Sequence, residues 1–188
     1  MNLPNVLTMS RFLWTVIFVV LIAQNTYSST LAAALVFALA SFTDLLDGYL
    51  AKKNNQITDF GKIMDPIADK FLILAAFVMF ILLGILPAWM VVLVAVREIA
   101  VTVSRVMRLS RKQVIAAEKS GKIKTVFQMG SIGVILLFLI LEKSSLSRGW
   151  SGSTEGVWLT VINILMFITV ILTVNSGVSY FLNARKAS

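Results

Sequence analysis

The sequence predicts an all-α integral membrane protein with six transmembrane helices. Of its 188 residues, 58% are apolar and 14% are charged, whereas soluble domains are roughly 45–50% apolar. A helix that crosses a bilayer needs about 20 mostly apolar residues, and the chain contains six stretches of this kind. Apolar residues run continuously through each stretch rather than alternating, which favours helices over the strands of a membrane barrel.

The six stretches follow one another with polar connections, so we expect a single membrane domain over residues 1–188. The second and fifth stretches carry polar residues at their ends. The last is long enough to tilt or to extend beyond the bilayer. The predicted spans are about residues 8–24, 30–51, 63–83, 86–108, 120–142 and 155–182.

Missing residue types limit the chemistry of the chain. It has no cysteine and no histidine, which excludes disulfides, thiol chemistry and the usual acid–base group near neutral pH. Any metal ion must therefore be held by oxygen, which favours magnesium, manganese or calcium over zinc. A net charge of +8 is typical of a membrane protein beside anionic lipid, so we expect membrane lipid and no nucleic acid as partners.

The distribution of basic residues predicts the orientation in the cell membrane. Connections 24–29 and 84–85 contain no lysine or arginine, and connection 143–154 contains only Lys143 and Arg148. The opposite side carries Arg11, Lys52, Lys53, Lys62, Arg105, Arg108, Arg111, Lys112, Lys119, Lys122, Lys124, Arg185 and Lys186. Basic residues are retained in the cytoplasm, so we expect both termini, the segment 105–124 and the acidic stretch 44–69, our candidate active site, on that side.

Four aspartates at helical spacing are the most informative feature of the sequence. Asp44 and Asp47 are three residues apart, and Asp65 and Asp69 are four apart, so each pair shares one face of a helix. A connection at 52–61 would join the two helices as a hairpin and bring the acidic faces together. Carboxylates at membrane depth are costly, and four in this arrangement could hold two divalent ions about 3.5–4 Å apart.

Neighbouring residues leave more than one interpretation open. Gly48 lies in an apolar helical pattern, where glycine costs about 1 kcal/mol relative to alanine, and Gly61 lies one turn before Asp65. The missing side chains either let a bulky group approach the backbone or serve helix packing in the membrane. The aspartates could instead be interfacial carboxylates that pair with lysines. We assign Asp59 to solvent or to a helix cap.

These residues resemble the signature of the CDP-alcohol phosphotransferase family, Asp-x2-Asp-Gly-x2-Ala-Arg-x8-Gly-x3-Asp-x3-Asp. The chain keeps every spacing from Asp44 to Asp69, with one departure, because the family's arginine is Lys52. Lysine keeps the charge but lacks the two-pronged guanidinium. The resemblance covers about residues 2–130 and includes the segments Asn2–Arg11, Asp65–Lys70, Arg97–Glu98 and Gly121–Gln128.

The resemblance implies a fold, a reaction and cofactors. The fold is the six-helix CDP-alcohol phosphotransferase fold, assembled as a homodimer with a cavity open to the cytoplasm and the lipid. The similarity is greatest to members that transfer the phosphatidyl group of CDP-diacylglycerol to sn-glycerol 3-phosphate in phospholipid biosynthesis, with release of CMP. Two divalent ions, Mg²⁺ or Mn²⁺, would neutralise the diphosphate in this reaction.

The family pattern also implies roles for the aspartates. Asp44, Asp47 and Asp65 would be metal ligands. Asp69 would be both a ligand and the general base for the acceptor hydroxyl. A carboxylate suits this role because a close anionic cluster raises the pKa of one of its members.

The CDP group would be bound by a second set of residues. Gly48 and Gly61 would let the cytidine and the phosphates lie against the backbone, and Lys52 would contact the diphosphate. Asn5 and Thr8 are weaker candidates for CDP binding, and capping of the first helix is an equal alternative for them.

An acceptor that carries its own phosphate needs cationic side chains near the aspartates. We expect Arg105 and Lys122 to bind this phosphate first, with Arg97 and Lys124 behind them. The alternative for Arg105, Lys122 and Lys124 is the ordinary basic face of the cytoplasmic side. Arg97 is costly inside a span and could instead pair with Glu98.

Other functions remain open from the sequence. A family member with another acceptor, such as a cardiolipin synthase or a phosphatidylinositol phosphate synthase, would differ only in the acceptor pocket. A cation transporter would spread its acids over several spans at the bilayer midplane, whereas these acids cluster at one helical hairpin. A pure assembly protein would leave the acidic cluster unexplained.

Overall fold

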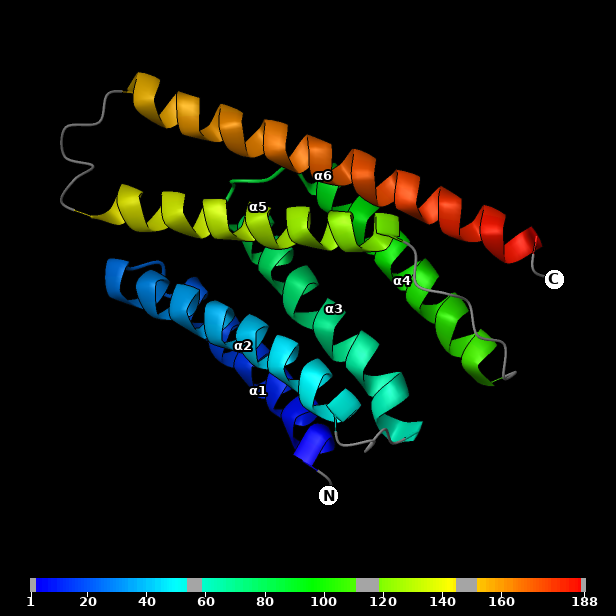
Figure 1. Ribbon diagram of the computed structural model, residues 1–188. Coiled ribbons are helices and arrows are strands. Elements are labelled where there is room, and N and C mark those ends of the chain that lie inside the picture. Colours follow the sequence, from blue (N-terminus) through cyan, green and yellow to red (C-terminus); the bar gives the residue numbers. More distant parts are fainter. Residues whose placement is uncertain (1–2, 54–58, 111–118, 145–151, 187–188) are drawn as a thin grey trace. The chain divides into compact units, whose positions relative to one another are not determined.

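The computed structural model describes residues 3–53, 59–110, 119–144 and 152–186, and every regular element in these ranges is a helix (Figure 1). The prediction of an all-α protein is therefore confirmed. The helices are α1 (Leu3–Ala23), α2 (Tyr27–Lys53), α3 (Asp59–Leu82), α4 (Ala88–Ser110), α5 (Lys119–Lys143) and α6 (Gly152–Lys186). Each helix overlaps one predicted span.

The connection between α2 and α3 is shorter than the apolar pattern suggests. α2 continues through Lys53 and α3 begins at Asp59, which leaves residues 54–58 between them. Lysine has a high helix propensity, so Lys52 and Lys53 extend the helix beyond the apolar run. Asp59 occupies the first position of α3 rather than a loop, and aspartate is favoured at that end of a helix.

The chain divides into two compact units. One comprises Met1–Met79 with Leu136–Arg148, and the other comprises Phe80–Ile135 with Gly149–Ser188. The first therefore contains α1, α2 and most of α3, and the second contains α4 and α6, while α5 contributes to both. The aspartate signature lies in the first unit, and the candidate acceptor cations lie in the second. Whether the chain functions as a single domain stays a prediction.

α1 and α2 form a helical hairpin with a tight turn at residues 24–26. Asn25 has a φ of 53°, a left-handed conformation that asparagine tolerates better than most residues. Thr26 Oγ1 accepts a hydrogen bond from the Ser29 backbone N–H (3.3 Å). Ser29 Oγ accepts one from the Thr26 backbone N–H (3.1 Å). This reciprocal capping box satisfies donors at the start of α2 and fixes where the chain reverses.

Aromatic contacts hold the first unit together. The ring centroids of Phe18 and Phe37 lie 5.9 Å apart across the α1–α2 pair. Ala33, one helical turn before Phe37 on α2, is fully buried. Small residues such as alanine allow helices to approach closely in a membrane protein. The rings of Phe12 and Phe71, 5.4 Å apart, join α1 to α3.

α3 ends in a Schellman motif. Gly84 has a φ of +75°, and its backbone N–H donates to the Ile81 carbonyl at 2.9 Å. The Ile85 N–H donates to the Phe80 carbonyl at 3.0 Å. These two bonds satisfy carbonyls that the helix end would otherwise leave unpaired, so the chain leaves α3 at a defined point before α4 begins.

Contacts within the second unit define the relative direction of α4 and α6. Arg97 on α4 hydrogen-bonds Ser176 on α6. Further along both helices, the Arg105 guanidinium lies 6.0 Å from the ring centroid of Tyr180. Because the residue numbers increase in the same direction along both helices, α4 and α6 run parallel. This direction is expected if α4, α5 and α6 are consecutive membrane spans, since α5 would run antiparallel to both.

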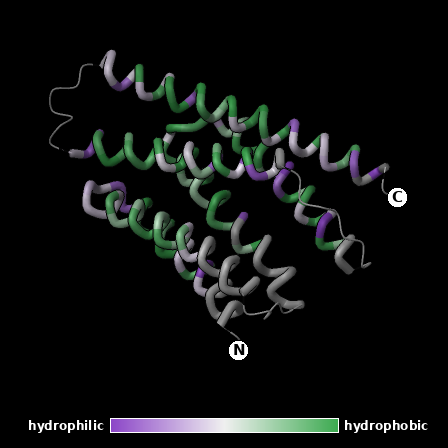
Figure 2. The backbone as a smooth tube through the Cα atoms, in the orientation of Figure 1, coloured by the Kyte–Doolittle hydropathy of each residue, from purple (hydrophilic) through white to green (hydrophobic). Residues whose placement is uncertain are grey.

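Apolar residues make up most of α6, as the hydropathy colours in Figure 2 show along much of its length. Those exposed include Val157, Val161, Ile164, Phe167, Ile171, Val174 and Val178. Exposed apolar surface of this extent is typical of contact with lipid. Two segments in the described part are long and apolar enough to cross a membrane, Gly121–Lys143 and Gly152–Asn183. The count of six crossings stays a prediction.

We predict that Gly84→Ala destabilises the protein by about 1–2 kcal/mol, because an L-residue is strained in the left-handed region. Gly130→Ala is the matched control. Among the described residues, no non-local atom lies within 4 Å of a Cβ added at either glycine, but only Gly84 of the two has a positive φ. Alanine is the better helix former, so the control should be neutral or stabilising. Thermal unfolding in detergent would measure both, and equal midpoints would contradict the prediction.

Candidate active site

The signature aspartates lie on two consecutive helices. Asp44 and Asp47 are near the C-terminal end of α2, and Asp65 and Asp69 are in the N-terminal half of α3. The backbone is helical at all four positions, which agrees with the spacing argument, while their side chains lie outside the described part. Six residue steps separate Lys53 from Asp59, so the two helix ends lie at most about 22 Å apart.

The candidate CDP-binding residues lie on the same helices and on α1. Gly48 and Lys52 are on α2, Gly61 is on α3, and Asn5 and Thr8 are on α1. Their side chains, too, lie outside the described residues. α1 begins at Leu3, so Thr8 lies beyond the first turn and is not in a capping position.

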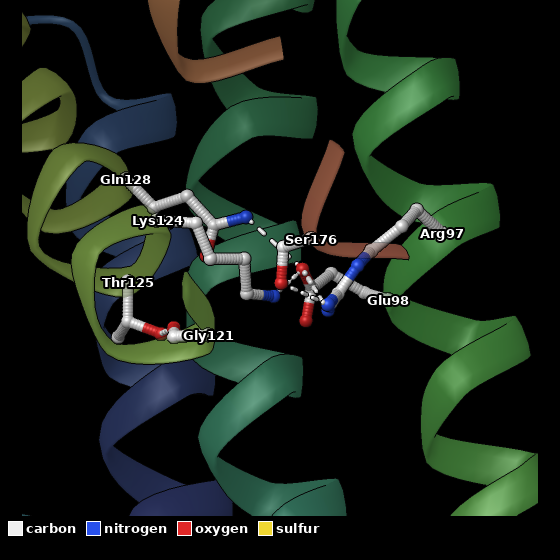
Figure 3. A network of polar contacts seen from close by, with 7 residues as sticks. All are labelled: Arg97, Glu98, Gly121, Lys124, Thr125, Gln128 and Ser176. Atoms are coloured by element: carbon white, nitrogen blue, oxygen red, sulfur yellow. Dashed lines mark hydrogen bonds and ion pairs between the residues drawn. The ribbon is translucent and has the colours of Figure 1, made fainter. Parts of the chain in front are cut away.

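A buried carboxylate organises the polar residues of the second unit (Figure 3). Glu98 on α4 is 1% exposed. Its Oε1 accepts a hydrogen bond from Lys124 Nζ and another from Gln128 Nε2 at 3.2 Å. Lys124 and Gln128 lie one turn apart on α5, and both point toward Glu98. Arg97 Nη1 also donates to this oxygen, at 3.3 Å.

The cost of burying these charges shows why they must stay together. Lys124 and Gln128 are as deeply buried as Glu98. An ionised carboxylate in such surroundings is tolerated only when cations and hydrogen-bond donors compensate it. A buried ion pair often stabilises a protein no more than apolar residues of the same volume would. Its presence here therefore favours a role for the charges beyond stability.

Arg97 extends this network to α6. Its Nη2 donates a hydrogen bond of 2.8 Å to Ser176 Oγ, while Nη1 contacts Glu98 on its own helix. Arg97 thus bridges α4 and α6, and Glu98 bridges α4 and α5. Arg105, two helical turns further on, lies over the ring of Tyr180 on α6.

The four candidate acceptor cations occupy different environments. Arg97 and Lys124 meet at Glu98. Lys122 is exposed, and two residues along a helix amount to a rotation of about 200°, so it faces away from Lys124. Arg105 is also exposed but lies on the face of α4 that contacts α6. The structure brings Arg97 and Lys124 together and does not bring Lys122 to them.

The sequence interpretation did not single out the residues that complete the network. From the sequence, Glu98 is predicted as a partner of Arg97 and belongs to the family resemblance, whereas no role is predicted for Ser176 or Tyr180. A signal for them exists in the spacing of polar residues along an otherwise apolar helix. Buried polar side chains recur on one face of α6 at Thr169, Thr173, Ser176 and Tyr180.

A family model described as CDP-alcohol phosphatidyltransferase matches residues 1–175. The chain belongs to the CDP-alcohol phosphatidyltransferase family. The resemblance inferred from the aspartate signature is thereby confirmed. The family match includes both the signature and the residues of α4 and α5 that meet at Glu98.

Curated relatives match this phosphatidyltransferase along nearly its whole length. A CDP-diacylglycerol–glycerol-3-phosphate 3-phosphatidyltransferase of Bacillus subtilis is 34% identical, over 96% of the chain and 93% of the relative. A Rickettsia felis protein of the same description is 32% identical, over 98% and 96%. A probable phosphatidylglycerophosphate synthase of Mycobacterium tuberculosis is 34% identical, over 98% and 82%.

We predict that Glu98→Gln destabilises the protein by about 3–5 kcal/mol, because it removes the charge that compensates buried Lys124. Glu142→Gln is the control, since Glu142 is an exposed partner of Lys143 and such pairs contribute about 0–1 kcal/mol. Thermal unfolding in detergent would measure both. Lys124→Met combined with Glu98→Gln should cost less than the sum of the single changes, and simple additivity would argue against the pairing.

Proposed function

We propose that the chain transfers the phosphatidyl group of CDP-diacylglycerol to sn-glycerol 3-phosphate, giving phosphatidylglycerophosphate and CMP. The observation that carries this proposal is the agreement of nearly full-length relatives of that description with the complete aspartate signature from Asp44 to Asp69. The description of these relatives names both substrates, CDP-diacylglycerol and glycerol 3-phosphate. A cationic network built on α4 and α5 gives the chain a means of binding an acceptor that bears phosphate.

We propose Mg²⁺ or Mn²⁺ as cofactor, with two ions per active site. The residues fit such ions by the chemistry of their donor set, which is four carboxylates in a chain without histidine or cysteine. Asp44, Asp47, Asp65 and Asp69 would hold them. When bound, the ions would neutralise the diphosphate and the charge on the departing CMP.

The reaction requires one proton transfer and one exchange of bonds at phosphorus. The acceptor hydroxyl oxygen bonds to the phosphorus of the phosphatidyl group, and the bond from that phosphorus to the CMP oxygen breaks. Asp69 takes the hydroxyl proton as general base, and CMP leaves with the electron pair. Lys52 lies one turn beyond Gly48 on α2 and would contact the diphosphate as a point charge.

The acceptor phosphate would be bound by the cations of the second unit. Arg97 is the strongest candidate on structural grounds, because contacts on two sides determine its direction and a guanidinium binds phosphate with two parallel hydrogen bonds. Lys124 would contribute charge from beside it. Arg105 and Lys122, both exposed, would attract the acceptor from solvent.

The proposed setting is the cell membrane, with six crossings and with both termini and the active site in the cytoplasm. Support comes from the basic residues on one side of the predicted spans and from the parallel direction of α4 and α6, which this topology requires. The family resemblance supports a homodimer.

The purified protein should release CMP from CDP-diacylglycerol when sn-glycerol 3-phosphate is supplied. Release should stop when a chelator removes divalent ions and return when Mg²⁺ or Mn²⁺ is added back, because the carboxylates alone repel the diphosphate. A panel of acceptors, including inositol phosphate and phosphatidylglycerol, would test the choice of acceptor. Turnover with one of these but not with glycerol 3-phosphate would reject the proposed function.

Asp69→Asn should reduce kcat by at least about 100-fold, because an amide cannot accept the hydroxyl proton. Asp59→Asn is the matched control, since Asp59 is the first residue of the same helix and lies outside the proposed ligand set. CMP release at saturating concentrations of both substrates would measure the effect. Full activity of the Asp69 variant would remove Asp69 as the base.

A further inference from the structure

The side chain of Arg97 lies directly against the backbone of α6. A Cβ added to Gly177 would lie 2.9 Å from Arg97 Cγ, 3.4 Å from Nε and 3.7 Å from Cδ. Contacts this short at Cγ require the base of the arginine side chain to move, not only its flexible tip. Because Gly177 has no side chain, the aliphatic part of the Arg97 side chain packs directly against the α6 backbone.

The tip of the same side chain is also held from α6. Ser176, adjacent to Gly177, accepts the hydrogen bond from Nη2 at 2.8 Å, and Glu98 accepts from Nη1. A guanidinium is planar and presents its donors in a fixed fork. Contacts at both terminal nitrogens, together with the stem against Gly177, determine the orientation of that plane.

We propose that Ser176 and Gly177 are positioning residues that hold the guanidinium of Arg97 in the direction needed to bind the acceptor phosphate. The inference rests on the proposed function, in which Arg97 contacts that phosphate. It gives α6, which contributes nothing to the aspartate signature, a part in determining acceptor affinity. The next turn of α6 continues the same face, where Tyr180 lies against Arg105.

The test compares Ser176→Ala, Gly177→Ala and Gly156→Ala in the full-length protein. Gly156 is the matched control, because it lies on the same helix and an added Cβ there has no neighbour within 4 Å among the described residues. Ser176→Ala and Gly177→Ala should each raise KM for glycerol 3-phosphate about tenfold, as expected for a lost or displaced charge-assisted hydrogen bond. KM for CDP-diacylglycerol and kcat should stay within about twofold of the control. Ser176→Ala adds no atoms, so it keeps the test decisive if Gly177→Ala does not fold.

Arg97→Lys separates this inference from the proposed function. Lysine keeps a cation beside Glu98 but loses the fork, so KM for glycerol 3-phosphate should rise, and adding Ser176→Ala should raise it no further. If Arg97→Lys leaves that KM unchanged, the acceptor role of Arg97 is wrong. If Arg97→Lys raises KM for glycerol 3-phosphate but Ser176→Ala and Gly177→Ala behave like Gly156→Ala, only the positioning role of Ser176 and Gly177 is overturned. An equal rise in KM for both substrates would indicate a general structural defect and would also overturn it.

Discussion

An ionised carboxylate buried among apolar helices must be compensated at hydrogen-bonding distance, because desolvation costs several kcal/mol per ion. Glu98 meets this requirement with Lys124 and Gln128 from α5 and with Arg97 from its own helix. Arg97 in turn reaches Ser176 on α6. A single acidic residue thus joins α4 to α5 directly and is linked to α6 through Arg97. Residues on α6 that carry no formal charge are drawn into this network through Arg97.

The proposed metal ligands and the proposed acceptor-binding cations lie on different helices. The signature aspartates are on α2 and α3, whereas Arg97, Arg105 and Lys124 are on α4 and α5. This separation by helix suits a reaction with two phosphate-bearing substrates. In the proposed function, the acids would serve the diphosphate through metal ions, and the cations would bind the acceptor phosphate directly.

The fold could be predicted because membrane helices are encoded by local composition. Helix ends were less accurate where polar residues with high helix propensity continue a helix, as Lys52 and Lys53 do in α2. The aspartate signature was readable because its members lie close together in the sequence. The contacts of Glu98 with Lys124 and Gln128 span 26 and 30 residues, and Arg97 with Ser176 spans 79. The spacing of polar residues marks such positions on a helix, but no sequence pattern indicates which of them pair at these separations, so the structure is needed to identify the pairs.

The turns at 24–26 and 83–87 contain no charged residue and are closed by their own hydrogen bonds. A segment that crosses a bilayer during biosynthesis is opposed chiefly by its charges and by backbone groups that lack partners. Turns of this kind present little of either, so the helices on each side of them can enter the membrane together as hairpins. In the proposed topology, most of the lysines and arginines lie on the other connections, on the cytoplasmic side. In that topology, the charge asymmetry of the chain and its compact turns would both favour insertion.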